Sequence, residues 1–119
     1  MAAVEQPKRE CVFLADTRER LRKLPEGVRD TFGFALFEAE QNRKHPAAKI
    51  MKGDLRGVVE IVEGDGSGTY RAMYTLKLKG RVVVLHVFQK KSKSGVATPQ
   101  SDVDLIKLRL AEAKELFNV

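Results

Sequence analysis

The stretch Thr69–Lys90, TYRAMYTLKLKGRVVVLHVFQK, contains the strongest strand signal in the chain. Its two halves, Thr69–Leu76 and Arg81–Lys90, are rich in β-branched and aromatic residues, which favour extended structure. The dipeptide Lys79-Gly80 lies between them and suits a tight hairpin turn. We therefore predict a pair of antiparallel strands here.

A turn centred on Lys79-Gly80 predicts which residues face each other and which share a side of the sheet. Arg71 then lies opposite Phe88, Met73 opposite His86, and Thr69 opposite Lys90. Because side chains alternate along a strand, Arg71, His86, Phe88 and Lys90 project from one face. The other face is nearly all apolar and is predicted to receive the helices; it consists of Tyr70, Ala72, Tyr74, Leu76, Val83, Leu85 and Val87.

Short elements are predicted around this hairpin. Asp16 with Glu19, and Ser101 with Asp104, have the spacing of capping boxes, which mark helix starts. Pro25 separates two early helices because proline interrupts a helix. The predicted order is a strand at Glu10–Ala15, a helix from Asp16 to about Lys23, a helix from about Glu26 to Asn42, a loop at Arg43–Gly57, a strand at Val58–Val62, a turn at Glu63–Gly68, the two hairpin strands, a loop at Lys91–Gln100 and a terminal helix.

This order predicts an α+β fold: a mainly antiparallel sheet, an N-terminal helical hairpin and a C-terminal helix, with the helices on one face. The neighbour of the first strand in the sheet stays open. The helices have apolar stripes, predicted to be buried, at Val28, Phe32, Ala35, Leu36 and Ala39 and at Val103, Ile106, Leu110, Ala113 and Phe117. We expect one domain over residues 1–119, with residues 1–9 as a flexible tail.

Composition excludes several classes of protein. A chain of 119 residues with 43% hydrophobic content is enough for one core. No run approaches the roughly 18 apolar residues needed to cross a bilayer, and no secretory signal is recognisable. Cys11 is the only cysteine, which fits a reducing cytoplasm, and with only His45 and His86 beside it an all-protein zinc site is not expected. We expect a cytoplasmic protein without a metal or other cofactor.

Positive charge is concentrated around the hairpin. Between Asp65 and Asp102 the chain has seven Lys or Arg residues and no Asp or Glu, although its formal net charge is only +6. Positive charge on a rigid sheet indicates an anionic partner, and RNA is the partner we predict.

The residues of the predicted charged face match the chemistry of RNA cleavage by its own 2′-hydroxyl, which needs no metal. That reaction requires a base, an acid for the leaving 5′-oxygen, and cations around the phosphate. In this interpretation His86 acts as the base or the acid, and Arg71 binds the phosphate. Lys90 or Lys91 neutralises the phosphate charge or transfers a proton. Phe88 could stack on a base, and Arg56 and Lys93 could contact phosphates.

A structural interpretation stands beside each of these roles. A strand histidine is often a hydrogen-bonded structural residue, and Phe88 could belong to the core. Arg56 and Lys93 could simply be solvated charges. Arg71→Ala is expected to abolish activity and leave the fold intact.

Three motifs carry a family resemblance: FLADTRERLRKLPEGVR near the start, GTYRAMY at Gly68–Tyr74, and VVVLHVFQKKSKSGVATPQSDVDLIKLRLAEAK. The chain resembles phage-derived HigB-like toxins of the RelE/ParE superfamily, from about Cys11 to Lys114. The resemblance implies a RelE-like fold, ribosome-dependent cleavage of mRNA, and a helix-turn-helix antitoxin as partner in a type II pair.

The resemblance also bears on single residues. Arg71 matches the strand arginine that holds the scissile phosphate, and Lys90 and Lys91 fall near the basic residue that ends the last strand. Glu60 departs from the pattern, because RelE-like toxins have lysines on that strand; it is either an acid–base group or a structural partner of Arg71. Two alternatives stay open: a ParE-like toxin that acts on a protein such as DNA gyrase, and an inactive phage relic that binds antitoxin or RNA.

Overall fold

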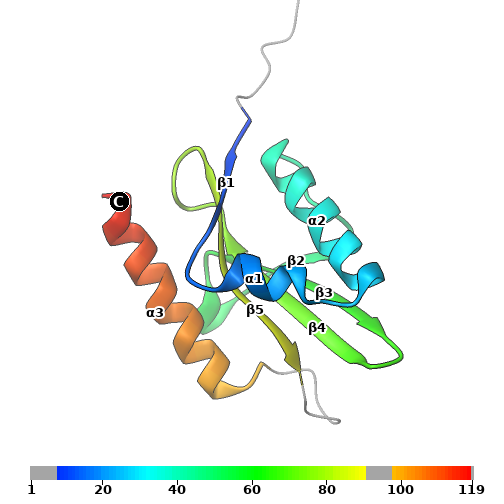
Figure 1. Cartoon of the computed structure of the whole chain (residues 1–119). Coiled ribbons are helices and arrows are strands. Elements are labelled where there is room, and N and C mark those ends of the chain that lie inside the picture. The colour runs from blue at the N-terminus through cyan, green and yellow to red at the C-terminus, as the bar shows by residue number, and fades with distance from the viewer. Residues whose placement is uncertain (1–7, 91–97, 119) are drawn as a thin grey trace, which may run out of the picture.

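The structure, a computed structural model, describes residues 8–90 and 98–118, which form a five-stranded sheet with helices on both faces (Figure 1). The strand order is β1-β5-β4-β3-β2, and every neighbouring pair is antiparallel except β1 with β5. The α+β class with a mainly antiparallel sheet is therefore confirmed. The elements are β1 Glu10–Phe13, α1 Thr17–Arg22, α2 Glu26–Glu40, β2 Ala48–Ile50, the 3-10 helix η1 Gly53–Leu55, β3 Val58–Asp65, β4 Gly68–Thr75, β5 Arg81–Lys90 and α3 Gln100–Leu116.

None of the helices in residues 8–90 and 98–118 is both long enough and apolar enough to cross a bilayer.

The β4–β5 pairing follows the predicted register over its open end and departs from it near the turn. Arg71 pairs with Phe88 and Met73 with His86, as predicted, but the register then shifts by one residue. Beyond this bulge, Val83 and Leu85 pack in the same buried cluster as Phe88, which corrects their predicted placement on the opposite face. A bulge adds one residue to one strand and so reverses the alternation of the side chains that follow it.

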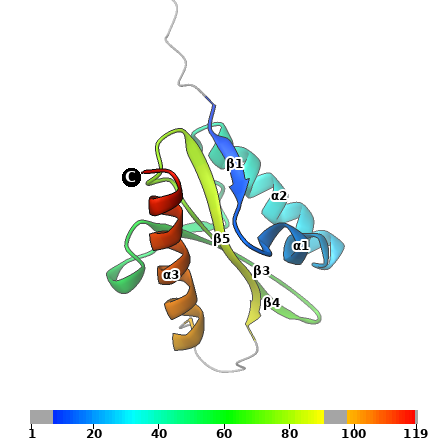
Figure 2. The ribbon, with the colours of Figure 1, turned by 60° about the vertical axis from the view of Figure 1, so that its left-hand side comes forward.

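Helices cover both faces of the sheet, so the prediction that they all pack on one face is wrong. Helix α2 buries its predicted stripe against one face, together with Tyr70, Ala72 and Tyr74. Helix α3 packs its own stripe against the other face, over Met73 and Leu85. Figure 2 shows the sheet between α3 on one side and α1 and α2 on the other.

The sequence suggested an open face because only its charged residues were considered. Arg71, His86 and Lys90 occupy one end of that face, whereas Val58, Met73, Val83 and Leu85 make the rest of it apolar. An apolar surface of this kind gains free energy when a second layer covers it. Helix α3 provides that layer.

Several boundaries differ from the sequence prediction. The predicted loop Arg43–Gly57 contains β2 and η1, and the first strand pairs in parallel with β5. Helix α3 begins one residue before Ser101, with Pro99 in the N-cap position. Residues 1–7 of the predicted tail lie outside the described residues, but Arg9 is held, because its backbone N–H donates to the carbonyl of Glu40 at 2.8 Å.

The packing of α3 predicts that truncation of two similar apolar side chains on this helix will lower the free energy of unfolding by different amounts. Ile106 is fully buried in the α3 cluster, whereas Leu108, two residues further on, is 57% exposed. Ile106→Ala should lower the free energy of unfolding by about 2–5 kcal/mol, because it leaves a cavity. Leu108→Ala is the matched control and should change it by less than about 1 kcal/mol. Urea denaturation measures both, and equal effects would contradict the proposed packing.

Candidate functional site

The predicted site residues of the hairpin lie on one face, at the end of the sheet near the start of α3. Arg71 on β4 and His86, Phe88 and Lys90 on β5 have the register and the alternation predicted from the sequence. Each of them is at most 8% exposed, so the face they share is largely covered. We call these four residues the hairpin cluster.

Arg71 forms a buried ion pair with Glu60 from the neighbouring strand β3. The guanidinium Nη1 lies 2.6 Å from the Glu60 carboxylate Oε2 and 3.4 Å from the hydroxyl of Thr98. Glu60 is paired directly with Met73 and therefore lies diagonally across from Arg71 on the same face. Glu60 thus contacts Arg71, as one of its two suggested roles requires, and its role in acid–base chemistry stays a prediction. A carboxylate at this distance offsets the cost of burying the guanidinium.

His86 is held on both sides. Its Nε2 lies 2.8 Å from Oδ1 of Asp102 in the first turn of α3, and its ring stacks on Phe88 with centroids 4.5 Å apart. Burial lowers the pKa of His86 below its ordinary value of 6.5, and the Asp102 carboxylate opposes this shift. His86 is therefore neutral at neutral pH, with its proton on Nε2, which faces the carboxylate.

This arrangement leaves the second ring nitrogen of His86 with a lone pair. Nδ1 is buried and has no hydrogen-bond partner within the described part of the chain. A neutral imidazole held at Nε2 by a carboxylate is oriented as a general base at Nδ1. The chemistry of a base is therefore present, in a position that solvent does not reach.

The predicted site residue Arg56 lies away from the hairpin cluster. Arg56 is exposed beyond η1, where the Gly57 carbonyl accepts a hydrogen bond from Thr75 at the far end of β4. Thr75 lies four positions after Arg71, which is about 13 Å along a strand. Arg56 is therefore not part of the hairpin cluster. Lys91 and Lys93 lie outside the described residues.

The segment between Asp65 and Asp102 contains no Asp or Glu, but in the folded structure acids from outside this segment lie beside its basic residues. Glu60 enters the cluster from β3 and Asp102 from α3, so two carboxylates accompany the two cations Arg71 and Lys90 around a neutral His86. Sequence reasoning missed Asp102 and Thr98, because the start of α3 was interpreted only as a capping box. An acid in the first turn of a helix that follows a basic strand is the signal that could have indicated Asp102.

Phe88 also borders an opening at the outer edge of β5. It lines a shallow pocket of about 200 Å³ together with residues of α1 and the segment after it, of β4 and of β5 itself, namely Arg20, Lys23, Leu24, Tyr70, Val87 and Gln89. Two of these side chains are cationic, and Arg20 donates to the carbonyl of Val87 at 3.2 Å. The residues that the structure describes contain no group of three His, Cys, Asp or Glu side chains suited to a metal ion.

The model of the family described as phage derived protein Gp49-like (DUF891) matches residues 19–111, more than half of the chain. The chain belongs to this Gp49-like family. The match includes α2, the whole sheet except β1, and most of α3, and therefore every residue of the hairpin cluster.

A solved structure has a similar fold. A chain from the crystal structure of the toxin–antitoxin complex RelBE2 from Mycobacterium tuberculosis aligns with a TM-score of 0.50 and 21% identity, and the alignment covers 70% of this chain and 99% of that chain. At this identity the likeness concerns the fold, and it confirms the RelE-like architecture predicted from the sequence. No curated protein matches the Gp49-like chain.

The buried ion pair corrects one expectation about mutants. Arg71→Ala would leave the Glu60 carboxylate buried without its partner, so the fold would be destabilised. We expect Arg71→Ala and Glu60→Ala each to lower the free energy of unfolding by about 3–5 kcal/mol. The double variant Arg71→Met/Glu60→Leu should cost clearly less than the sum of the two, because no charge remains unpaired. Additive losses in urea denaturation would contradict the pairing.

The lowered pKa of His86 predicts how the stability of this Gp49-like protein depends on pH. Below about pH 6.5 the unfolded chain binds a proton that folded His86 resists. The stability from this group is therefore fully present above that pH and is lost as the pH falls through the folded pKa. His86→Gln should show a smaller decrease in unfolding free energy than the wild type between about pH 7.5 and pH 5. Parallel decreases in the two proteins would contradict the burial of His86.

Proposed function

We propose that this Gp49-like protein is the toxin of a type II toxin–antitoxin pair and acts as a HigB-like, ribosome-dependent mRNA endoribonuclease. Its partner would be a helix-turn-helix antitoxin. The observation that carries the proposal is the gathering of a guanidinium, an imidazole, an aromatic ring and an ammonium on one face of the β4–β5 hairpin. Membership of a phage-derived family and the fold shared with a chain of a toxin–antitoxin complex support it.

The proposed reaction uses the message as its own nucleophile. His86 would accept the proton of the 2′-hydroxyl at Nδ1, the 2′-oxygen would attack the adjacent phosphorus, and the bond from phosphorus to the 5′-oxygen would break. A protonated lysine, Lys90 or Lys91, would give its proton to that oxygen. The products are a 2′,3′-cyclic phosphate and a 5′-hydroxyl, and no metal takes part.

Arg71 and Phe88 have supporting roles in this proposal. The phosphate would accept hydrogen bonds from Arg71, in competition with the Glu60 carboxylate that holds it now. The Phe88 ring is 7% exposed and stacks on His86, so we assign it to the orientation of the imidazole first. The pocket that Phe88 borders with Arg20 and Lys23 offers a place for a neighbouring nucleotide. Arg56 and Lys93 would contact more distant phosphates.

The decisive experiment adds purified protein to a translating extract and maps new mRNA 5′ ends. Cleavage within ribosome-bound codons is the expected result for the wild type. His86→Gln should reduce the rate about 10²–10⁴-fold, because the glutamine amide can reach Asp102 but cannot transfer the proton. Arg71→Lys keeps the charge beside Glu60 and should reduce the rate about 10–100-fold, because the guanidinium fork is lost.

Matched controls separate catalysis from folding. Arg29 is exposed on α2, so Arg29→Lys makes the same substitution outside the site and should keep full activity. Circular dichroism should show native folding for every variant. Intact mRNA with accumulated DNA breaks would overturn the nuclease in favour of the ParE-like alternative. Intact mRNA and intact DNA would favour an inactive relic.

A further inference from the structure

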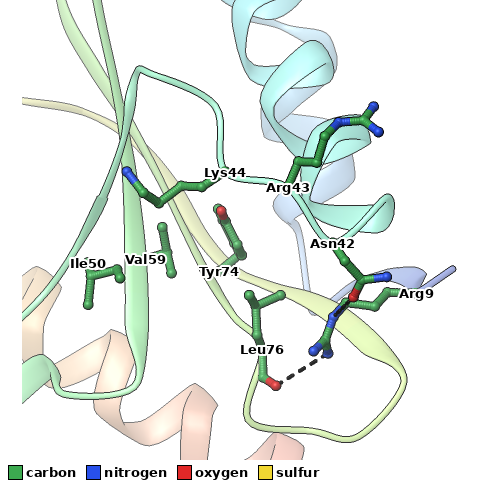
Figure 3. Close-up of a pocket in the computed structure, with 8 residues that line it drawn as sticks. All are labelled: Arg9, Asn42, Arg43, Lys44, Ile50, Val59, Tyr74 and Leu76. Atoms are coloured by element: carbon green, nitrogen blue, oxygen red, sulfur yellow. Dashed lines mark hydrogen bonds between the residues drawn. The ribbon is translucent and has the colours of Figure 1, made fainter. Parts of the chain in front are cut away.

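A second pocket lies on the face of the sheet that α2 covers, opposite the hairpin cluster (Figure 3). Its volume is about 260 Å³, and it opens between the C-terminal end of α2, β1 and the sheet. The apolar part is formed by Ile50, Val59 and Leu76, and the polar part by Arg9, Asn42, Arg43, Lys44 and the hydroxyl of Tyr74. An apolar pocket with a few converging polar groups is the usual form of a small-molecule site.

Tyr74 provides the first sign that the pocket takes a ligand. The residue is 1% exposed and its ring belongs to the core, yet its hydroxyl makes no hydrogen bond to any residue that the structure describes. In Figure 3 the hydroxyl oxygen points toward the segment that carries Lys44. Burial raises the pKa of Tyr74, so the group stays a neutral hydroxyl that can donate and accept. Because Tyr74 lines the pocket, its hydroxyl is available to exchange a hydrogen bond with a ligand atom there.

Arg9 provides the second sign, because its guanidinium is fixed at the rim of the pocket. Nε donates to the side-chain oxygen of Asn42 at 3.0 Å, and Nη1 donates to the carbonyls of Leu76 and Arg81 at 3.4 and 3.3 Å. Nη2 makes no hydrogen bond within residues 8–90 and 98–118. A guanidinium oriented in this way needs little further ordering to bind an anion.

The other cations of the rim contribute unequally. Lys44 donates to the carbonyl of Ala48 at 3.1 Å, which leaves its two other ammonium protons for a ligand. Arg43 is paired with Glu38 at 2.6 Å, and in Figure 3 its guanidinium points away from the pocket. The anionic part of a ligand would therefore meet Arg9 and Lys44.

We propose that this pocket binds a nucleotide, with the base inside and the phosphate at the rim. The base would contact Val59 and Leu76 and exchange a hydrogen bond with the Tyr74 hydroxyl. The phosphate would accept hydrogen bonds from Arg9 and Lys44. Inorganic phosphate alone leaves the apolar walls unfilled, and an apolar acid leaves the Tyr74 hydroxyl unpaired. The nucleotide is either free or part of an RNA strand, and the site is separate from the proposed cleavage site.

Titration of the full chain with nucleoside monophosphates, followed by NMR or calorimetry, tests the proposal. The four common ribonucleoside monophosphates should bind with dissociation constants in the micromolar to millimolar range, and at least one should bind more tightly than inorganic phosphate or benzoate. Equal binding of phosphate would reduce the pocket to a simple anion site and overturn the proposal. Equal binding of benzoate would overturn it as well.

Two variants assign the binding to this pocket. Tyr74→Phe removes only the unpaired hydroxyl and should weaken nucleotide binding about 2- to 10-fold without loss of folding. Arg9→Gln should weaken it about 10-fold, whereas the exposed Arg29→Gln, its matched control, should not. Binding that neither Tyr74→Phe nor Arg9→Gln weakens would place the nucleotide elsewhere and overturn the proposal.

A competing RNA oligonucleotide separates the two sources of the nucleotide. If an RNA strand is the natural ligand, a short oligonucleotide should bind more tightly than a monophosphate and lose affinity in Tyr74→Phe. If a free nucleotide is the ligand, the oligonucleotide should not compete with it. Both results support a nucleotide site, and neither depends on mRNA cleavage, so the failure of one proposal leaves the other standing.

Discussion

The pairing register of β4 and β5 is the constraint on which the rest of the structure depends. Because side chains alternate along a strand, a shift of one residue over its whole length would move Arg71 away from His86. The bulge between Met73 and Tyr74 confines that shift to the end near the turn. The polar cluster therefore keeps its alignment at one end, while Val83 and Leu85 turn toward α3 at the other.

The face of the sheet under α3 has an apolar end and a polar end, and each is covered in a different way. Its apolar end is covered by the stripe of α3 around Ile106, and its polar end is closed by Glu60 and Asp102. The burial of Arg71 and His86 is possible because each has a carboxylate within hydrogen-bond distance. This pairing also means that the charge of Arg71 is already neutralised by Glu60, so in the proposed function RNA would have to compete with that carboxylate.

The face of the sheet that α2 covers also has polar groups at its border. There the core is complete around Tyr74, but the phenol hydroxyl and one nitrogen of Arg9 have no partner among the described residues. Polar atoms without a partner in the described part of the chain therefore occur on both faces, because His86 Nδ1 is one of them on the α3 face. For the first face we propose a reaction in which a phosphate displaces the Glu60 carboxylate from Arg71, and for the second the binding of a nucleotide.

Local pattern in the sequence determined the α+β class, the β4–β5 pairing of Arg71 with Phe88, and the buried stripes of α2 and α3, because each depends on residues close together in the chain. Only the tertiary structure decided that β1 joins β5 in parallel, that α3 covers the charged face, and that Asp102 reaches His86. It also brought Arg9 to Asn42, 33 residues away. These features depend on contacts between distant segments, and the pattern within one segment shows which of its faces is buried but not which other segment covers that face.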